Sequence, residues 1–368
     1  MKDFNYWKEL HESQKLDEFS TDNIGLLWLK TKSIVRKELI AEFTQENNIV
    51  LKETALGKQF IELFGLLCKS PDNSHEILNS YIREKNEIQV LKLNTEQLVS
   101  ELYKLKNFDW GGDYKNSLDK YLVSHYVKVL KSYDTLVSKF ESEIQVAVQG
   151  YVLNSWYNHW SSILIEHIFK SHPTVLPTVG QIKSVDFFIN NVPLDLKVTY
   201  LPAEYIKFKR KEKRLPVELT FLKGKAKEAE ITFDKKAKSA DIFYEISEKM
   251  KDKNDKFCND VLTKLKKEKL EILKEAQGNP KLLAKWLYEN QGEMRFGSEN
   301  RLFLVLVDTN DFNNSWKLKR NLELLKPTIM KYLDNFKNKN IDDLKVSFNY
   351  KGKPQTFTAL TDIIFVVK

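Results

Sequence analysis

The sequence predicts a mixed α/β protein in which an all-helical N-terminal domain precedes a domain built on a largely buried sheet. Three observations lead to this prediction. Pro71 is the only proline before Pro173, and long stretches without helix breakers favour helices. Two runs rich in β-branched and aromatic residues, 182–189 and 193–200, flank an Asn-Asn turn signal. The run 302–307 is uninterruptedly apolar, as is typical of a strand buried on both faces.

The composition excludes several classes of protein. A chain of 368 residues with 42% hydrophobic and 12% aromatic residues is long enough for two domains and too apolar for wholesale disorder. No apolar run approaches the roughly 18 residues of a membrane span, and the N-terminus lacks the apolar stretch of a signal peptide. Cys68 and Cys258 form neither a CxxC pair nor a disulfide framework. We therefore expect a soluble, cytoplasmic bacterial protein with no membrane partner.

Residues 1–145 are expected to form the helical N-terminal domain. Within 118–144, apolar residues recur every three or four positions, which describes one face of a helix. The same spacing resumes after Gly150 and stops before Pro173, because a proline disfavours helix in the residue that precedes it. The second domain is assigned to 146–368.

The second domain is expected to contain five strands outside a charged insertion and a sixth within it. In chain order the elements are strands 182–189 and 193–200, a charged insertion 203–298, strand 302–307, helix 316–336, and strands 346–350 and 357–367. The insertion, between the second and third strands, is expected to carry a strand at 217–222 and helices at 255–276 and 280–288. Without it, the order is helix, strand, strand, strand, helix, strand, which indicates an α/β domain.

A cluster of charged side chains is predicted on the hairpin formed by the first two of these strands. If Asn190-Asn191 is a two-residue turn, Asp186 lies directly opposite Asp195, and directly paired residues have Cβ atoms about 4.5–5.5 Å apart. Lys197 points to the same face, because side chains alternate along a strand. The net charge of +8, 59 basic minus 51 acidic residues, weakly favours a polyanionic partner for this surface.

Two opposed carboxylates destabilise a strand pair unless something compensates their charge. Mg²⁺ does so with carboxylate oxygens, and it is typically held by one or two carboxylates beside a phosphate. The lysine would then neutralise a phosphate oxygen or help to activate water, which suits metal-assisted hydrolysis of a phosphodiester. The alternative is an ordinary cross-strand salt-bridge cluster without chemistry.

Asp186, followed across a hairpin by Asp195-Leu-Lys197, resembles the PD-(D/E)xK nuclease superfamily, which includes most type II restriction endonucleases. The resemblance covers about 150–200 and 300–367 and implies a restriction-endonuclease-like αβββαβ core. It makes Asp186 and Asp195 the catalytic, metal-binding carboxylates and Lys197 the catalytic lysine. Val185 departs from the proline of the motif, and many members add an acid from the preceding helix.

Glu166 is the candidate for that additional acid. The resemblance further implies a site-specific endonuclease that acts on double-stranded DNA as a homodimer, with Mg²⁺ as cofactor and Mn²⁺ as a substitute. The helical N-terminal domain 1–145 would then clamp DNA or mediate dimerisation. No nucleotide cofactor is expected, because the sequence has no Walker lysine loop. Two alternatives stay open: a nuclease of another defence or DNA-repair system, and a non-catalytic DNA-binding protein on an inactive nuclease fold.

A basic segment follows the second strand of the hairpin directly. Between residues 205 and 227 there are nine Lys or Arg and two Glu, a net charge of +7. Phosphate contacts are assigned to six of these cations, Lys207, Lys209, Arg210, Lys211, Lys213 and Arg214. The alternative is a solvated surface segment. Polar residues of a later loop are candidates for reading base edges, or else form an ordinary polar loop: Asn290, Gln291, Glu293, Arg295 and Arg301.

Overall fold

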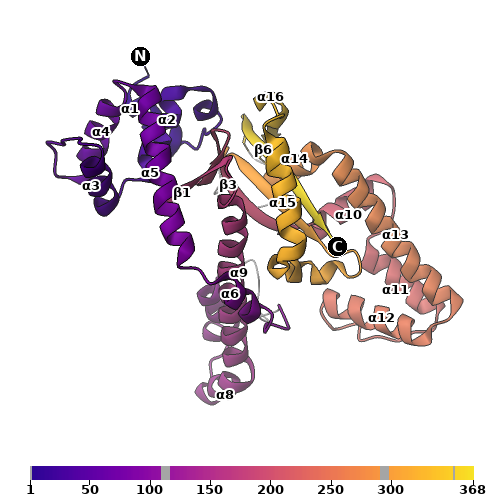
Figure 1. Ribbon diagram of the computed structural model, residues 1–368. Helices are drawn as coiled ribbons and strands as arrows, with labels where there is room; N and C mark the ends of the chain where they lie inside the picture. The colour runs from indigo at the N-terminus through magenta and orange to yellow at the C-terminus, as the bar shows by residue number, and fades with distance from the viewer. Residues whose placement is uncertain (1, 109–116, 291–297, 351–352) are drawn as a thin grey trace.

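The computed structural model describes residues 2–108, 117–290, 298–350 and 353–368. These residues form the mixed α/β fold that the sequence predicts, with helices up to Lys170 and a mixed sheet after it (Figure 1). None of the helices in the described ranges is long and apolar enough to cross a membrane.

The helices that precede the sheet in the chain form an N-terminal group and a central part that ends in a long helix. The N-terminal group is α1 (Phe4–Glu12), η1 (Glu18–Thr21), α2 (Asn23–Ser33), α3 (Lys37–Glu46), α4 (Leu56–Leu67), α5 (Pro71–Leu91) and α6 (Thr95–Leu102). The central part is α7 (Leu118–Leu122), η2 (Val123–Val127), α8 (Tyr133–Lys139), η3 (Phe140–Ile144) and α9 (Gln145–Lys170).

The sheet has the strand order β1-β2-β3-β4-β6-β5. Its strands are β1 (Val175–Ile182), β2 (Val185–Ile189), β3 (Val192–Tyr200), β4 (Arg301–Val307), β5 (Lys345–Asn349) and β6 (Thr356–Val367). Strands β1, β2 and β3 are joined antiparallel, β4 pairs in parallel with both β3 and β6, and β5 pairs antiparallel with β6. The sheet therefore combines an antiparallel hairpin region with a parallel centre.

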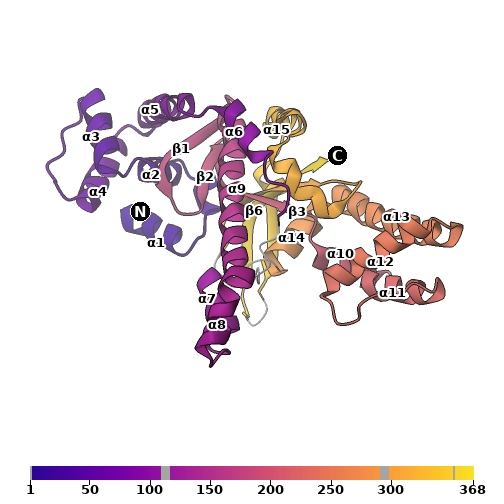
Figure 2. The same ribbon diagram turned by 90° about the horizontal axis from the view of Figure 1, so that it is seen from below.

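Further helices connect the strands of the parallel centre. Between β3 and β4 lie α10 (Ala203–Glu212), α11 (Glu218–Glu228), α12 (Ser239–Lys253), α13 (Lys256–Gly278) and α14 (Pro280–Asn290). Between β4 and β5 lie η4 (Phe312–Arg320), α15 (Leu322–Phe336) and α16 (Ile341–Leu344). Figure 2 shows α15 and the α10–α14 group on different sides of the sheet.

Three hydrophobic cores meet at the sheet. Phe188 of β2 joins the core of the N-terminal helices. Phe187 and Leu304 pack with α9 and α15, whereas Phe303 and Val305 pack with α10, α13 and α14. Alternate residues of β4 thus enter opposite cores, which confirms the prediction of a strand buried on both faces. Strands β2 and β3 lie where the three groups of helices converge.

The sequence prediction missed strand β1, because it contains two strand breakers. Pro177 is tolerated because β1 is an edge strand and the ladder is irregular between Pro177 and Ile182. Gly180 is required by packing, since a Cβ there would lie 2.1 Å from the Ser33 carbonyl oxygen of α2. With β1 counted, the charged segment 203–298 follows the third strand, and its expected place between the second and third strands is wrong.

Two other expected elements differ in the structure. The strand expected at 217–222 is wrong, because this segment enters α11, whose Leu222 and Ala226 are buried one helical turn apart. The single helix face expected over 118–144 is interrupted by a turn after η2. From Tyr133 to Lys170 the helical run then continues without a break, so the domain boundary expected at 145/146 lies inside it.

Candidate active site

The turn at Asn190-Asn191 sets the register of the β2–β3 hairpin. Both residues have positive φ, 46° and 68°, as a two-residue turn that follows the twist of its strands requires. Asparagine is one of the few residues that adopt this conformation readily. The resulting pairs are Ile189 with Val192, Phe188 with Pro193 and Phe187 with Leu194, as the sequence predicts.

Asp186 lies where the two strands separate. The ladder between them ends at the Phe187–Leu194 pair, and the Asp186 side chain takes the place of a backbone acceptor. Its Oδ2 accepts a hydrogen bond from the Leu196 N–H at 2.7 Å. Burial, reinforced by the negative charges of Asp195 and Glu166, raises the pKa of Asp186 to about 6. Deprotonation of Asp186 therefore costs free energy, and a nearby cation would lower that cost.

Asp195 is buried in the middle of β3 and is surrounded by charge. Its carboxylate lies 2.8 Å from the Lys197 ammonium and 3.8 Å from the Arg301 Nε. Burial raises the pKa of Asp195, with a contribution from Glu299, while Lys197 and Arg301 oppose the rise. Its own N–H donates to the Asn300 carbonyl, which joins β3 to the segment that leads into β4.

Glu166 approaches the hairpin from α9. Phe169, on the same helix, stacks on Phe187 with ring centroids 5.1 Å apart and fixes α9 against β2. The Glu166 carboxylate is near enough to Asp186 to raise its pKa, and it forms an ion pair with Lys170 at 2.9 Å. We call Glu166, Asp186, Asp195 and Lys197 the acid cluster. Asp195 and Lys197 are in contact, Asp186 accepts the N–H of Leu196 between them, and Glu166 acts on Asp186 through its charge.

Sequence reasoning missed Glu299 and misjudged Arg301. Arg301, 4% exposed, forms an ion pair with Glu299 at 3.1 Å, and its guanidinium lies over the Tyr288 ring. The Ser184 hydroxyl also donates to the Glu299 carboxylate. Because Arg301 is buried, the suggestion that it reads base edges is wrong. Gln291, Glu293 and Arg295 lie outside the described residues.

Lys30 of α2 is a second residue that the sequence did not reveal. It is 1% exposed, and its ammonium donates to Asn191 Oδ1 at 3.0 Å and to His75 Nδ1 at 3.1 Å. His75 Nδ1 is an acceptor because Nε2 carries the proton donated to the Asn23 carbonyl at 3.0 Å. Burial lowers the pKa of Lys30 to about 8. Lys30 thus links the N-terminal helices directly to the turn of the β2–β3 hairpin, which carries Asp186 and Asp195.

Several cations of the basic segment after β3 form ion pairs within the protein. Arg210 is 1% exposed, pairs with Glu268 at 2.6 Å and donates to the Pro216 carbonyl, so its guanidinium lies inside the protein rather than at the surface where DNA contact was expected. Lys209 and Lys213 both pair with Glu275. Lys207 pairs with Glu204 at 3.4 Å, while Lys211 and Arg214 are exposed.

The donor groups of the cluster fit magnesium by type, although a complete cage is not assembled. In the described parts of the chain, no group of three or more His, Cys, Asp or Glu side chains is placed to hold a metal ion. Asp186 and Asp195 provide the two carboxylates that suffice for Mg²⁺ when water and a substrate phosphate complete its shell. A carboxyl pair in which one member is buried and the other half-buried is also an environment that a divalent cation stabilises.

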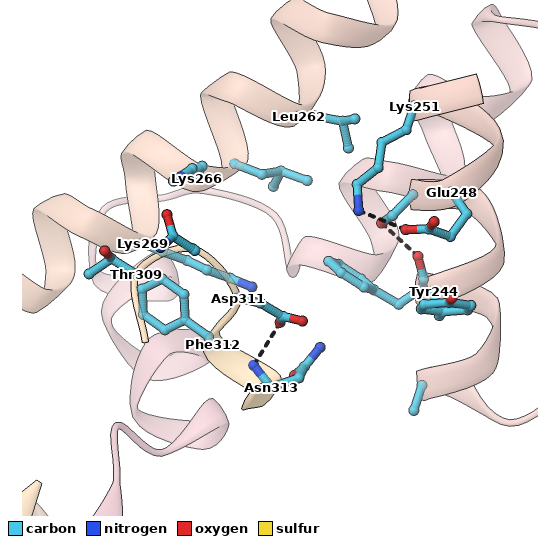
Figure 3. Close-up of a pocket in the computed structure, with 15 residues that line it drawn as sticks. Tyr244, Glu248, Lys251, Leu262, Lys266, Lys269, Thr309, Asp311, Phe312 and Asn313 are labelled. Carbon is cyan, nitrogen blue, oxygen red and sulfur yellow. Dashed lines mark hydrogen bonds and ion pairs between the residues drawn. The ribbon is translucent and has the colours of Figure 1, made fainter. Parts of the chain in front are cut away.

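A pocket elsewhere in the molecule contains none of the predicted site residues. It lies between α12, α13 and the loop after β4, and is lined by residues that include Tyr244, Lys251, Lys266 and Asp311 (Figure 3). Two of its ammonium groups form ion pairs, Lys251 with Glu248 at 2.7 Å and Lys269 with Glu218 at 3.3 Å. This hollow is therefore separate from the acid cluster.

Comparisons of the chain with protein-family models, with curated proteins and with solved structures found no match.

Proposed function

We propose that the protein is a Mg²⁺-dependent endonuclease that hydrolyses phosphodiester bonds of double-stranded DNA. The observation that carries the proposal is the β2–β3 hairpin, which gathers Asp186, Asp195 and Lys197 beside Glu166 of α9. Carboxylates beside a lysine are the groups that metal-assisted phosphodiester hydrolysis requires. The raised pKa of Asp186 adds support, because strongly perturbed carboxyl groups concentrate at functional sites.

Each residue has a distinct role in this proposal. Asp186 and Asp195 would hold Mg²⁺, which supplies a Lewis acid for the phosphate and lowers the pKa of bound water. Glu166 would serve as an additional carboxylate on the α9 side. Lys197 has a side chain that is 41% exposed, so its ammonium can meet a phosphate oxygen from solvent. There it would stabilise developing negative charge and orient the attacking water.

The biological setting that we favour is site-specific cleavage as a type II restriction enzyme. Double-strand cleavage requires two active sites, which favours a homodimer. Nuclease activity in another defence or repair system uses the same chemistry, and the distribution of products separates the two. Restriction predicts discrete fragments from a defined plasmid, whereas the alternative predicts attack at ends, branches or unspecific positions.

One observation favours a second candidate, a non-catalytic DNA-binding protein. The Asp195 carboxylate is already compensated by Lys197 at 2.8 Å and approached by Arg301, as in a structural ion-pair network. In that case the cluster would stabilise the sheet without binding a metal. This candidate predicts binding to DNA that is unaffected by EDTA and leaves the DNA intact.

Plasmid cleavage with matched variants tests the proposal. Wild-type protein should convert supercoiled plasmid to cut forms with Mg²⁺ or Mn²⁺ and not with EDTA, and Asp195→Asn and Lys197→Ala should each abolish the reaction. The control pair Asp362 and Lys339 is similar in geometry, 2.6 Å apart with comparable exposure, and lies away from the cluster. Asp362→Asn and Lys339→Ala should retain cleavage. Intact plasmid under all metal conditions would reject the proposal.

A further inference from the structure

A helical arm, residues 118–153, projects from the body of the molecule at the end of α9 that lies far from the sheet (Figures 1 and 2). It comprises α7, η2, α8, η3 and the first turns of α9. Its small internal core contains Tyr121, Tyr126 and Ala147. The acid cluster uses the opposite end of α9, where Glu166 is located, so the proposed chemistry gives the arm no role.

Exposed apolar side chains are concentrated on this arm. Among the described residues, twenty large hydrophobic side chains are exposed, and nine of them belong to the arm, which has 36 of the 368 residues. The nine are Val123, Val127, Val129, Tyr133, Val137, Phe140, Val146, Val152 and Leu153. Single exposed apolar residues are ordinary, whereas a contiguous exposed patch marks a site of association.

The exposed residues follow the period of a helix. Positions 133, 137, 140, 144, 148 and 152 are all apolar and are separated by three or four residues, so they form one stripe along α8, η3 and α9. Tyr133 is 79% exposed and Phe140 is 50% exposed. A shallow groove beside the stripe is lined by Phe140, Ile144 and Val148. Four of the six stripe residues are exposed in the single chain, whereas Ile144 and Val148 are half-buried and Ile144 packs against the arm's own core.

The net charge of the arm indicates which kind of partner covers the apolar stripe. The arm has four lysines and two aspartates plus two glutamates, so its net charge is 4 − 4 = 0, although the whole chain carries +8. A nucleic-acid partner requires an excess of cations, which the arm lacks. A membrane-surface helix likewise carries an excess of Lys and Arg on its polar face. A neutral surface with charges of both signs meets an identical surface without net repulsion.

We propose that the arm is the surface through which two copies of this chain associate. The same stripe on both copies is self-complementary, as a two-fold symmetric interface requires. A stable interface of standard size buries about 800 Å² on each partner. The stripe on α8 therefore has to be joined by exposed valines of η2 and α9, and the two arms pack as a small helical bundle. Association through the arm leaves the acid clusters of both copies free.

Association is measured in the absence of DNA and metal, so the result does not depend on the proposed nuclease activity. Wild-type protein at tens of micromolar is expected to sediment as a dimer, at twice the chain mass of 43.3 kDa. The double variant Val137→Asp, Phe140→Asp is expected to sediment as a monomer. Both side chains are exposed in the single chain, so the variant should fold, and circular dichroism verifies its helix content.

The matched control is Tyr244→Asp, which changes another exposed aromatic residue, 67% exposed on α12 and outside the arm. This variant should remain a dimer. A second measurement uses Tyr133→Cys in a Cys68→Ser background, in which the remaining Cys258 is buried, and oxidation should link two copies through position 133. A monomeric wild type, or a dimer that the double variant leaves intact, would overturn the proposal. So would loss of DNA or vesicle binding by the double variant without a change in mass.

Discussion

The β2–β3 hairpin and helix α10 follow one another in the chain, and both carry dense charge, yet their charges are used differently. On α10, Arg210 is buried against Glu268, and Lys209 shares Glu275 with Lys213 just after the helix. On the hairpin, Asp195 is buried and Asp186 is half-buried, the pKa of both is raised, and the charge of Asp195 contributes to the rise at Asp186. Charge that is paired internally stabilises the fold, whereas buried like charge is retained at a cost in stability and so indicates a function.

The largest expected effect concerns α10. Arg210→Ala should lower the free energy of unfolding by about 3–5 kcal/mol, because it leaves Glu268, itself only 12% exposed, buried without its partner. Lys211→Ala, the exposed neighbour on the same helix, should change stability by less than about 0.5 kcal/mol. Urea denaturation of the two variants measures both values. Equal, small effects would show that Arg210 is not the structural residue that its burial implies.

The next effect concerns the hairpin, where removal of a charge should stabilise the protein. The folded state raises the pKa of Asp186 from 3.8 to about 6, so it favours the protonated form. The stabilisation linked to this group is complete below about pH 4 and is lost as the pH rises through about 6. A shift of this size corresponds to up to roughly 3 kcal/mol.

Asp186→Asn should therefore be more stable than wild type at pH 8 in EDTA, and the difference should shrink at pH 5. The amide oxygen of asparagine can still accept the Leu196 N–H. Asp334→Asn serves as the control, because Asp334 is 70% exposed and pairs with His172 away from the hairpin acids. Urea denaturation at pH 8 and at pH 5 measures the difference in stability between each variant and the wild type. A variant that is less stable than wild type at pH 8 would contradict the interpretation of Asp186 as a strained carboxylate.

A smaller effect is expected from the lysine that holds the turn. Lys30 and Lys319 are a matched pair, since both are buried, both have a pKa lowered to about 8, and each donates to an asparagine side chain. Lys30 contacts the turn of the hairpin, at Asn191, whereas Lys319 lies over the ring of Tyr200 at the far end of β3. Lys30→Met should reduce the cleavage rate about tenfold, or about 1.4 kcal/mol, without changing DNA affinity.

Lys319→Met should leave the cleavage rate unchanged. Amide hydrogen exchange adds a measurement that is independent of activity: Lys30→Met should accelerate exchange in the β2–β3 hairpin, and Lys319→Met should not. The same exchange in the hairpin of both variants would mean that Lys30 contributes to the core without positioning the acids.

The sequence allowed the hairpin to be predicted because its register depends on a local feature. Two asparagines adopt positive φ, and the pairing that follows is fixed by counting residues. Strand β1 was missed for the opposite reason, because Pro177 and Gly180 are acceptable only at a sheet edge that packs on α2. The formation of β1 therefore depends on tertiary packing, which the local sequence pattern does not reveal.

The candidate site likewise combines residues that the local sequence predicts with residues that only tertiary packing brings near. Asp186, Asp195 and Lys197 are close in sequence, and alternation along the strands places them together. Lys30 contacts a residue 161 positions away, and Glu299 reaches Asp195 only through the pairing of β3 with β4. The burial of Arg210 depends on α13, which no pattern within α10 reveals. Contacts of this kind become visible only in the folded chain.

Divalent-cation binding tests most directly whether the hairpin is a metal-dependent centre. Titration with Mn²⁺, followed by electron paramagnetic resonance, should show a site in the wild type. The site should be lost in Asp186→Asn and in Asp195→Asn, and retained in Asp362→Asn. Equal binding by all four proteins, or none by the wild type even with added DNA, would contradict the account.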